Sequence, residues 1–438
     1  MSQLQRRHVR RPSYERALAA YRAADNDACL VHLTDLDHER STILRVRALT
    51  RLGRLHEARE VVLEATLADA GELERAELNV AYANVAMKLR RHDVLDVLDD
   101  AERSVAETGA RTLKAELDFI RSRHAWADGD LDAAERHAER GAAAGEDDRT
   151  SVAHLQHVRT FALNLQGLLA QERERFDLAA VRFREALDVY DTAPVADHWI
   201  PAYSTANLAV LARDFAAATS SADLEKRIDR VRWAPATAAQ RFFALHGLGW
   251  ARAHEGDQLG ALRTFHAAAD IAPSPALKVM AWIDHANLGR AIGAGLVATE
   301  STLYAADGAE AVRWEDVNDM ERLVLLFAAE STASFDPVRA RRMLRRYEAT
   351  RLAEDVAATG IVGSENVRWR CFEMRAEAAV LRAEGFAARA ATLFGEECEA
   401  WQRIGSHARA AIARRDLEEL GAGLSTLGAD VRGELRAR

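Results

Sequence analysis

The residues with the best spacing for chemistry are two histidines. His154 and His157 lie three positions apart in HLQH, about one helical turn, where two imidazoles could hold a metal ion. No carboxylate or third histidine follows at a suitable spacing, so we interpret them as surface polar residues and predict no metal. Glycine-rich phosphate loops, nucleophile elbows and kinase motifs are absent from the sequence. We therefore expect no catalytic residue, no cofactor and no enzyme activity.

The cysteines and apolar segments indicate a cellular compartment. Cys29, Cys371 and Cys398 are too few and too scattered for a disulfide framework or a zinc site, and each is expected to be a small buried apolar residue. No apolar run approaches the roughly 20 residues that span a bilayer. The N-terminal MSQLQRRHVRRPS lacks the apolar segment of a signal peptide. The sequence thus predicts a cytoplasmic protein with no membrane contact.

The charge distribution argues against a nucleic-acid-binding protein. The chain has 59 basic and 68 acidic residues, a formal charge of −9, and the two signs are interspersed along the sequence. The arginines of RRHVRR, residues 6–11, could contact phosphates. No helix-turn-helix pattern follows them, and a domain that binds nucleic acid directly more often has a basic face. We expect residues 1–11 to form a basic flexible tail and nucleic acid not to be a partner.

The elements that must position any functional residue are helices. At 438 residues the chain exceeds the size at which one core keeps growing, so it should divide into domains or extend by stacking. Only 7 residues are Pro and 24 are Gly, while good helix formers dominate. No sustained strand-like alternation bounded by turn residues occurs. The composition predicts an all-α protein that extends by stacking.

One segment follows a known two-helix repeat pattern closely. Residues 245–273 contain a Leu-Gly pair, a turn glycine, an A-x3-F pair and a terminal proline: Leu248, Gly249, Gly256, Ala261, Phe265 and Pro273. Small residues at Gly249 and Ala261 let the two helices approach, and Phe265 fills the space toward the next pair. This segment resembles the tetratricopeptide repeat family. The resemblance implies a right-handed α-solenoid of antiparallel helix pairs.

The pattern recurs along most of the chain. Equivalent first-helix positions follow one another at intervals of 40, 36, 45, 42, 40, 40 and 39 residues: Val46, Ala86, Ser122, Gly167, Ala209, Gly249, Gly289 and Ala328. We expect about nine repeats in one solenoid over residues 12–420, and a capping helix or tail over 421–438. Turn-forming residues cluster in three segments where the solenoid could bend: 141–151, 191–201 and 359–366.

The resemblance also implies a binding surface. The long period is similar to that of bacterial regulatory sensor solenoids, namely those of LuxR-type activators and peptide-pheromone receptors. In the family, one stripe of each first helix lines a concave groove, and an Asn before the Leu-Gly pair can hydrogen-bond a bound peptide. Asn84, Asn207 and Asn287 match that position, and Asn164 is one residue away from it. An amide offers both a donor and an acceptor to a peptide backbone, but Asn here also serves local structure.

The predicted groove stripe combines basic, amide and aromatic residues. Its members are Arg47, Arg51, Asn84, Arg91, Arg123, Trp126, Asn164, Tyr203, Asn207, Arg213, Phe243, His246, Trp250, Asn287 and Arg290. Arginines at one end and aromatics near the middle suit an extended segment with acidic and apolar groups. Trp and Phe at helical spacing are equally typical of a core.

Three hypotheses follow from the sequence. The first is a non-enzymatic bacterial regulatory or sensor protein that binds a peptide or protein segment in its concave groove. The second is a scaffold subunit of a larger complex that binds through its convex face or its ends. The third is an enzyme with a site of unfamiliar pattern, which would need convergent titratable groups that the sequence does not display. Self-association is left open.

Overall fold

Helices account for all the regular secondary structure in the described part of this computed structural model. The structure describes residues 3–34, 36, 39–65, 71–143, 152–192, 199–215, 218–231, 233–234, 237–314, 319–357 and 367–421, and no strand occurs among them. The first ten helices are α1 (Gln3–Arg22), α2 (Asn26–Leu33), α3 (Glu39–Arg51), α4 (Leu55–Glu64), α5 (Glu72–Lys88), α6 (Val94–Thr108), α7 (Arg111–Ala127), α8 (Leu131–Ala142), α9 (Val152–Glu172) and α10 (Phe176–Asp191).

The second half of the chain continues in the same way. Its helices are α11 (Trp199–Asp214), α12 (Ser221–Arg230), α13 (Ala238–His254), α14 (Gln258–Asp270), α15 (Pro275–Ala291), α16 (Gly295–Ala311), α17 (Asp319–Ala333), α18 (Pro337–Ala357), α19 (Val367–Ala383) and α20 (Ala387–Arg403). A further helix covers 407–421. In the described residues α1 to α20 make ten successive pairs, where about nine repeats were expected.

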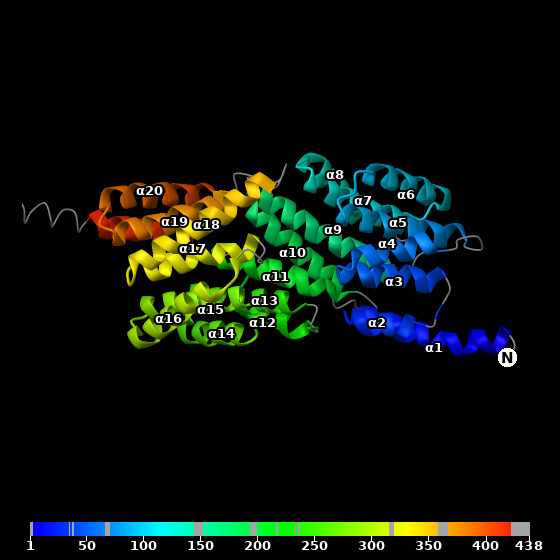
Figure 1. Ribbon diagram of the computed structural model, residues 1–438, viewed down its shortest axis with the longest axis horizontal. Coiled ribbons are helices and arrows are strands. Elements are labelled where there is room, and N and C mark those ends of the chain that lie inside the picture. Colours follow the sequence, from blue (N-terminus) through cyan, green and yellow to red (C-terminus); the bar gives the residue numbers. More distant parts are fainter. Residues whose placement is uncertain are drawn as a thin grey trace, which may run out of the picture. The chain divides into compact units, whose positions relative to one another are not determined.

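The helices are arranged in two compact units. Unit 1 comprises residues 1–173, 177–205 and 229–241, and unit 2 comprises 174–176, 206–228 and 242–438. In unit 1, each odd-numbered helix packs on its even-numbered partner and also on the next odd-numbered helix, from α3 through α5 and α7 to α9 (Figure 1). In unit 2, α15, α17 and α19 follow one another in the same way. Each unit is therefore a stack of antiparallel helix pairs.

The repeat register predicted from the sequence is confirmed. The eight positions from Val46 to Ala328 fall on eight successive odd-numbered helices, α3 to α17. The A-x3-F positions also behave as expected, because Ala261 and Phe265 are fully buried. A Cβ atom added to Gly249 would lie 2.5 Å from the Phe265 ring, and Gly167 stands in the same relation to Phe183. Each of these glycines makes room for the aromatic ring of the second helix.

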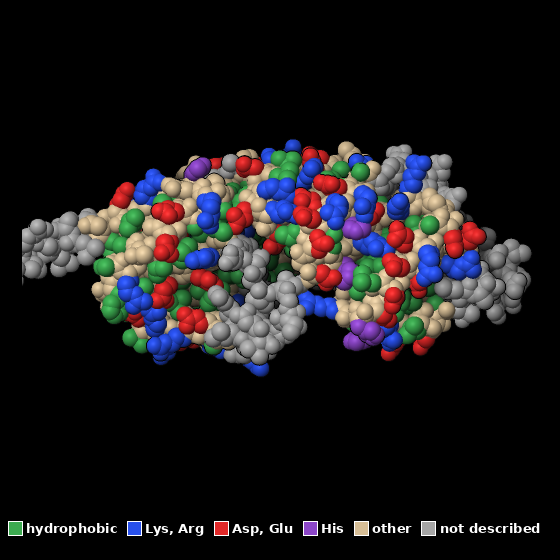
Figure 2. Space-filling model, turned by 90° about the horizontal axis from the view of Figure 1, so that it is seen from above, with side chains coloured by type: hydrophobic (Ala, Val, Ile, Leu, Met, Phe, Trp, Pro, Cys, Tyr) green, Lys and Arg blue, Asp and Glu red, His purple; other side chains and the backbone are tan. Residues whose placement is uncertain are grey.

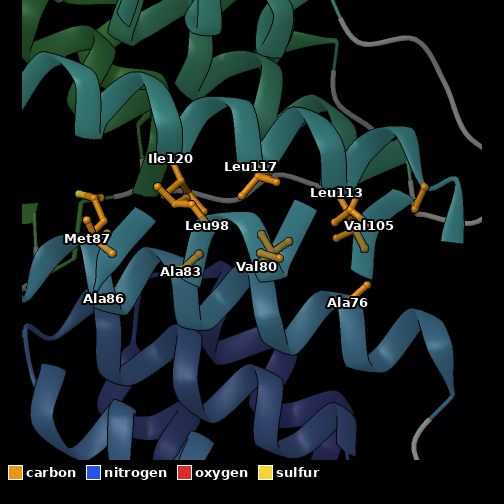
Figure 3. Close-up of a cluster of buried hydrophobic side chains, with 13 residues drawn as sticks. Ala76, Val80, Ala83, Ala86, Met87, Leu98, Val105, Leu113, Leu117 and Ile120 are labelled. Atoms are coloured by element: carbon orange, nitrogen blue, oxygen red, sulfur yellow. The ribbon is translucent and has the colours of Figure 1, made fainter. Parts of the chain in front are cut away.

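The core between neighbouring pairs alternates small and large side chains. Between α5, α6 and α7, alanines such as Ala83 and Ala86 face the longer Leu98, Leu117 and Ile120 (Figure 3). All five are buried. The small residues let the backbones approach while the large ones fill the remaining space, as close packing requires. The three cysteines are buried as well, as predicted.

A left-handed turn residue ends the first helix of most pairs. Gly53, Gly129 and Gly256 have φ of 73°, 82° and 89°. Glycine adopts this conformation without the steric cost that a Cβ atom brings. The same place is taken by Arg90 and by Glu174, which have φ of 50° and 58°. The turn geometry is thus kept even where the residue is not glycine.

An aspartate that follows the turn starts several second helices. The Asp130 carboxylate accepts a hydrogen bond from the backbone N–H of Ala133 at 2.9 Å, and Asp257 accepts one from Gly260 at 2.9 Å. Asp25 caps α2 in the same way. A capping carboxylate satisfies an N–H group that the helix leaves unpaired and favours the positive end of the helix dipole. Turn and cap together set the angle between the helices of a pair.

The expected boundaries of the solenoid are only partly covered by the described residues. Helix α1 begins at Gln3, so it includes most of the segment 1–11 that was expected to be a tail. The expected bend at 359–366 lies outside the described residues, as do most of 141–151 and 191–201 and the end of the chain from residue 422. No described helix has the length and hydropathy that a membrane-spanning helix requires.

Candidate peptide-binding site

Unit 1 contains a pocket that is lined only by first helices. Its volume is about 310 Å³, and its lining residues come from α1, α3, α5, α7, α9 and α11. Seven of the fifteen predicted groove residues line it: Arg47, Arg51, Asn84, Arg123, Trp126, Asn164 and Tyr203. On α3, α5, α7 and α9 the lining residues recur at intervals that include three and four residues, which places them on one face of each helix. The repeat register therefore brings these residues to a common surface.

Two arginines of α3 are held in place by neighbouring helices. Arg47 pairs with Glu116 of α7, with 3.0 Å between Nη2 and Oε2. Arg51 lies over the Tyr21 ring, 3.6 Å from its centroid, and donates a hydrogen bond to the Tyr21 carbonyl oxygen at 2.9 Å. The ring and the carbonyl orient the guanidinium plane. Both guanidinium groups are thus pre-positioned at the pocket wall.

Lys88 on α5 is a lining residue of the pocket that was not predicted from the sequence. Its Nζ donates to the Thr50 carbonyl oxygen at 3.3 Å, and it lines the pocket together with Arg51 and Arg123. Burial lowers its pKa to about 8, and the positive charges of Arg123 and Arg51 act in the same direction. Lys88 follows Asn84 by one helical turn, and that spacing is the signal that could have identified it.

The pocket carries an excess of positive charge. Burial lowers the pKa of Arg123, whose guanidinium lies 5.9 Å from the centroid of the Phe119 ring. In the described part of the chain neither Arg123 nor Lys88 contacts a carboxylate. The lining residues include four cations and one carboxylate, Glu116, which gives a formal charge of +3 when all are ionised. The outer surface differs, since basic and acidic side chains are interspersed over the face in Figure 2.

An aromatic wall lies beside the cations. The Phe119 and Phe161 rings have centroids 5.6 Å apart, and the His157 ring meets Phe161 edge-on at 4.9 Å. Trp126 also lines the pocket. Aromatic side chains offer large apolar contact areas with little loss of conformational entropy, so they serve as anchors for a bound segment.

The side-chain oxygens of the two asparagines in the pocket differ in their hydrogen bonding. The Asn84 Oδ1 atom is buried and has no hydrogen-bond partner among the residues that the structure describes. Asn164 Oδ1 accepts a hydrogen bond from the Ser204 hydroxyl at 3.1 Å. A buried acceptor without a partner is unfavourable by about 1–3 kcal/mol, and a ligand N–H could relieve that cost. Asn84 is therefore the better candidate for contact with a ligand backbone.

Arg91 does not lie on the inner stripe where it was expected. Helix α5 ends at Lys88, and Arg91 belongs to the turn before α6. Its guanidinium forms a bidentate pair with Asp93, with distances of 2.7 and 2.5 Å. The extra turn residues rotate Arg91 away from the pocket, so it is not part of the candidate site.

In unit 2, two predicted groove residues belong to a buried network. His246 is buried and forms a hydrogen bond with the Asp284 carboxylate at 2.5 Å, and Trp250 donates to the same carboxylate at 2.9 Å. Burial acts to raise the pKa of Asp284, but the bond to His246 and nearby positive charge lower it overall. Asp284 comes from α15, the first helix of the next pair. This network links successive pairs of the stack.

Arg213 is a core residue of unit 2. Its guanidinium lies 4.3 Å from the Phe327 ring centroid and 5.0 Å from that of Phe372, and it is buried. Burial lowers its pKa to about 10. The adjacent Asp214 is also surrounded by Arg368 and Arg409, whose charges outweigh burial and lower the pKa of Asp214. These residues hold the core of unit 2 together by ion pairing and aromatic contact.

The remaining predicted residues belong to unit 2, and among them Arg290 is exposed. Arg290 donates to the hydroxyl groups of Thr302 at 2.7 Å and Ser331 at 2.8 Å, and it also bonds the Asn287 side chain. Phe243 packs edge-on against Phe242 at 5.5 Å. Asn207 is half-buried on α11. Arg290 thus links α15 to α16 and α17, whereas the contact of Phe243 lies within α13.

No metal site emerges from the described side chains. No group of three or more His, Cys, Asp or Glu residues is suitably arranged among them. The His154 side chain lies outside the described residues, whereas His157 belongs to the aromatic wall.

Comparisons with known proteins find solved structures of low similarity. No protein-family model and no curated protein matches the sequence. A Rap protein solved with competence and sporulation factor aligns over 89% of this chain and 98% of its own, with 14% identity and a TM-score of 0.43. The apo form of RapI aligns over 87% and 99%, with 10% identity and a TM-score of 0.45. Yeast Tom70 aligns over 94% and 96%, with 12% identity and a TM-score of 0.38.

Helix pairs that share the same internal contacts define the fold of this chain. Gly249 with Phe265, and Gly167 with Phe183, reproduce one close approach in two units of the chain. Left-handed turns and aspartate caps recur at the expected places. In fold, the chain is an all-α, tetratricopeptide-like array of antiparallel helix pairs.

Proposed function

We propose that this protein is a non-enzymatic receptor that binds an extended peptide or protein segment in the pocket of unit 1. The observation that supports this most is the convergence of four cations, an aromatic wall and an unpartnered Asn84 acceptor on one concave surface. An extended segment presents backbone N–H groups and alternating side chains, which such a surface can bind together. A cytoplasmic, bacterial regulatory role is the setting in which we place this activity.

The pocket suits binding better than catalysis. Burial lowers the pKa of two of its four cations, Lys88 and Arg123, and Glu116 is paired with Arg47. No nucleophile next to a general base is found among its described lining residues.

Affinity capture with matched variants tests this proposal. Wild-type protein, Asn84→Ala, Arg123→Gln and the control Arg91→Ala would be immobilised and exposed to native cytosol, and captured proteins quantified by mass spectrometry. Loss of a desolvated partner group costs about 1–3 kcal/mol, a factor of about 5 or more in affinity, so below saturation both pocket variants should retain about one fifth or less of the specific partner. Arg91→Ala should retain it fully. Equal capture by all four proteins would contradict the proposal.

A second candidate function is supported by the surface of α16. Leu296, Leu303 and Tyr304 are 90%, 40% and 54% exposed. Residues seven and eight positions apart share one helix face, so these side chains form an exposed apolar strip. The scaffold hypothesis requires an exposed binding surface outside the groove. The strip on α16, the second helix of its pair, is such a surface. An assembly contact at α16 is therefore the alternative to binding in the pocket.

A further inference from the structure

Three cations from three successive first helices line the unit 1 pocket, and two of them act on the pKa of the third. They are Arg51 on α3, Lys88 on α5 and Arg123 on α7. Arg47, the fourth cation, is already paired with Glu116. Arg51 and Lys88 each donate a hydrogen bond to a backbone carbonyl oxygen, and the Arg123 guanidinium lies over the Phe119 ring. Like charges gathered in one partly buried pocket repel one another.

We propose that Arg51, Lys88 and Arg123 form a subsite for a doubly charged phosphate monoester on the bound segment. This inference rests on the proposed function and specifies its ligand. A phosphate monoester carries a charge of about −1.5 to −2 at neutral pH and offers three acceptor oxygens. Three cations on three helices can each donate to a different oxygen, and arginine forks suit this geometry. A carboxylate has one charge and two oxygens, so it leaves part of the cluster uncompensated.

The aromatic wall indicates which kind of ligand group would lie next to the phosphate. Phe119 lies beneath the Arg123 guanidinium and continues into Phe161 and His157. A ring that carries the phosphate, or an apolar residue beside it, could pack there while the phosphate meets the cations. A phosphotyrosine peptide is therefore a suitable probe for the subsite.

The pH dependence of binding separates a phosphate from a carboxylate. The charged or titratable residues that surround Lys88 in the pocket are Tyr21, Arg47, Arg51, Glu116, Arg123, His157 and Tyr203. Because the pKa of Lys88 is about 8 in the free protein, affinity for any anion should fall as pH rises above that value. A phosphate monoester gains its second charge near pH 6, so its affinity should also rise through about pH 6. A carboxylate ligand lacks that rise.

Three blocked pentapeptides test the proposal by calorimetric titration of the full-length protein. They differ only at the central residue, which is phosphotyrosine, glutamate or tyrosine, with alanine elsewhere. We expect the phosphopeptide to bind at least about tenfold more tightly than the glutamate peptide, because it offers the additional charge and acceptor. Its affinity should peak between about pH 6 and pH 8. Binding at pH 8 should take up protons, seen as a difference between buffers of unlike ionisation enthalpy.

Variants assign the effect to the cluster. Lys88→Met and Arg123→Met should each reduce the preference for phosphotyrosine over glutamate to less than about threefold. Lys114→Met is the matched control, because Lys114 is exposed on α7 outside the pocket, and it should leave the preference unchanged. Circular dichroism of each variant would confirm that the helices are intact.

Several results would overturn the inference. Equal affinity for the phosphotyrosine and glutamate peptides would reject the phosphate subsite and leave the proposed peptide receptor standing. No measurable binding of the phosphopeptide at millimolar concentration would also reject the subsite. Tighter binding of adenosine monophosphate than of the phosphopeptide, lost in Lys88→Met, would assign the cluster to a nucleotide instead. The proposed function fails separately, when pocket variants capture the native partner as well as wild type does.

Discussion

At the scale of single residues, the chain's polar side chains divide into two groups with opposite tasks. In unit 2, His246 and Trp250 meet the carboxylate of Asp284, so their hydrogen-bonding groups serve the fold. In the unit 1 pocket, Asn84 Oδ1 is left without a partner, and Lys88 contacts no carboxylate among the described residues. Unsatisfied polar groups cost stability, and natural proteins keep them where function requires them.

Lys88 should therefore reduce the stability of the ligand-free protein. Its pKa is about 8 when folded and about 10.4 in an unfolded chain, so the unfolded state binds more protons between those values. Stability should rise with pH across that window. Lys88→Met should raise the free energy of unfolding by about 1 kcal/mol below pH 8, and the gain should shrink toward pH 10.

Thermal and denaturant unfolding at pH 7 and pH 10 would check this, with Lys114→Met as the control. A gain for Lys88→Met that is the same at both pH values would mean that the lysine's charge is not the cause. A loss of stability would mean that Lys88 makes a net favourable contribution to the fold.

At the scale of elements, the sequence predicts the helices better than the side-chain environments on them. A Leu-Gly pair, a turn glycine and an A-x3-F pair depend on contacts within one helix pair, so local spacing reveals them. Leu248 and Gly249 fall on the odd-numbered α13, and Ala261 and Phe265 fall on its even-numbered partner α14, as predicted. Whether Trp250 faces a groove or a neighbour depends on Asp284, which lies 34 residues away on another helix. A single sequence does not reveal that pairing in advance.

Contacts between distant helices, which a single sequence does not reveal, also explain which residues of the candidate site were predicted and which were not. Arg47, Arg51, Asn84 and Arg123 line the pocket because the period near 40 residues keeps one stripe in register through unit 1. Arg91 was misplaced because α5 ends three residues earlier and the turn redirects the chain. The one-turn spacing from Asn84 places Lys88 on the pocket face, but its nearness to Arg51 and Arg123 depends on two other helices, which a single sequence does not reveal.

The close approach within a helix pair can be tested by one substitution made at two places. At Gly249, an added Cβ would lie 2.5 Å from the buried Phe265 ring, whereas at Gly395 on α20 it would meet nothing within 4 Å. Gly249→Ala should reduce the free energy of unfolding by about 1–3 kcal/mol through overpacking. Gly395→Ala should increase it by about 0.5–1 kcal/mol, because alanine favours a helix more than glycine does.

Thermal unfolding of both variants shows whether each substitution lowers or raises the stability of the protein. If Gly249→Ala were stabilising, like an ordinary helical glycine replacement, the helix pair would not have the repeat packing assigned to it. If both variants were destabilised equally, the loss could not be attributed to the contact with Phe265.

At the scale of the whole molecule, two surfaces compete as the functional one. The pocket of unit 1 offers cations, aromatic rings and an unpartnered amide oxygen, which suit an extended segment. The α16 strip of unit 2 offers exposed Leu296, Leu303 and Tyr304, which suit an assembly contact. Each unit has its own helix stack and core, so a partner could bind one unit without the other.

Site-specific photo-crosslinking decides between these surfaces most directly. A benzoylphenylalanine residue would replace Trp126 or Phe161 in the pocket, or Tyr304 on α16, one at a time in the full chain. Each protein would be irradiated with the partner identified by affinity capture, and crosslinked peptides would be mapped by mass spectrometry. The account predicts crosslinks from at least one of the two pocket positions and none from Tyr304. Crosslinks from Tyr304 with none from either pocket position would contradict it.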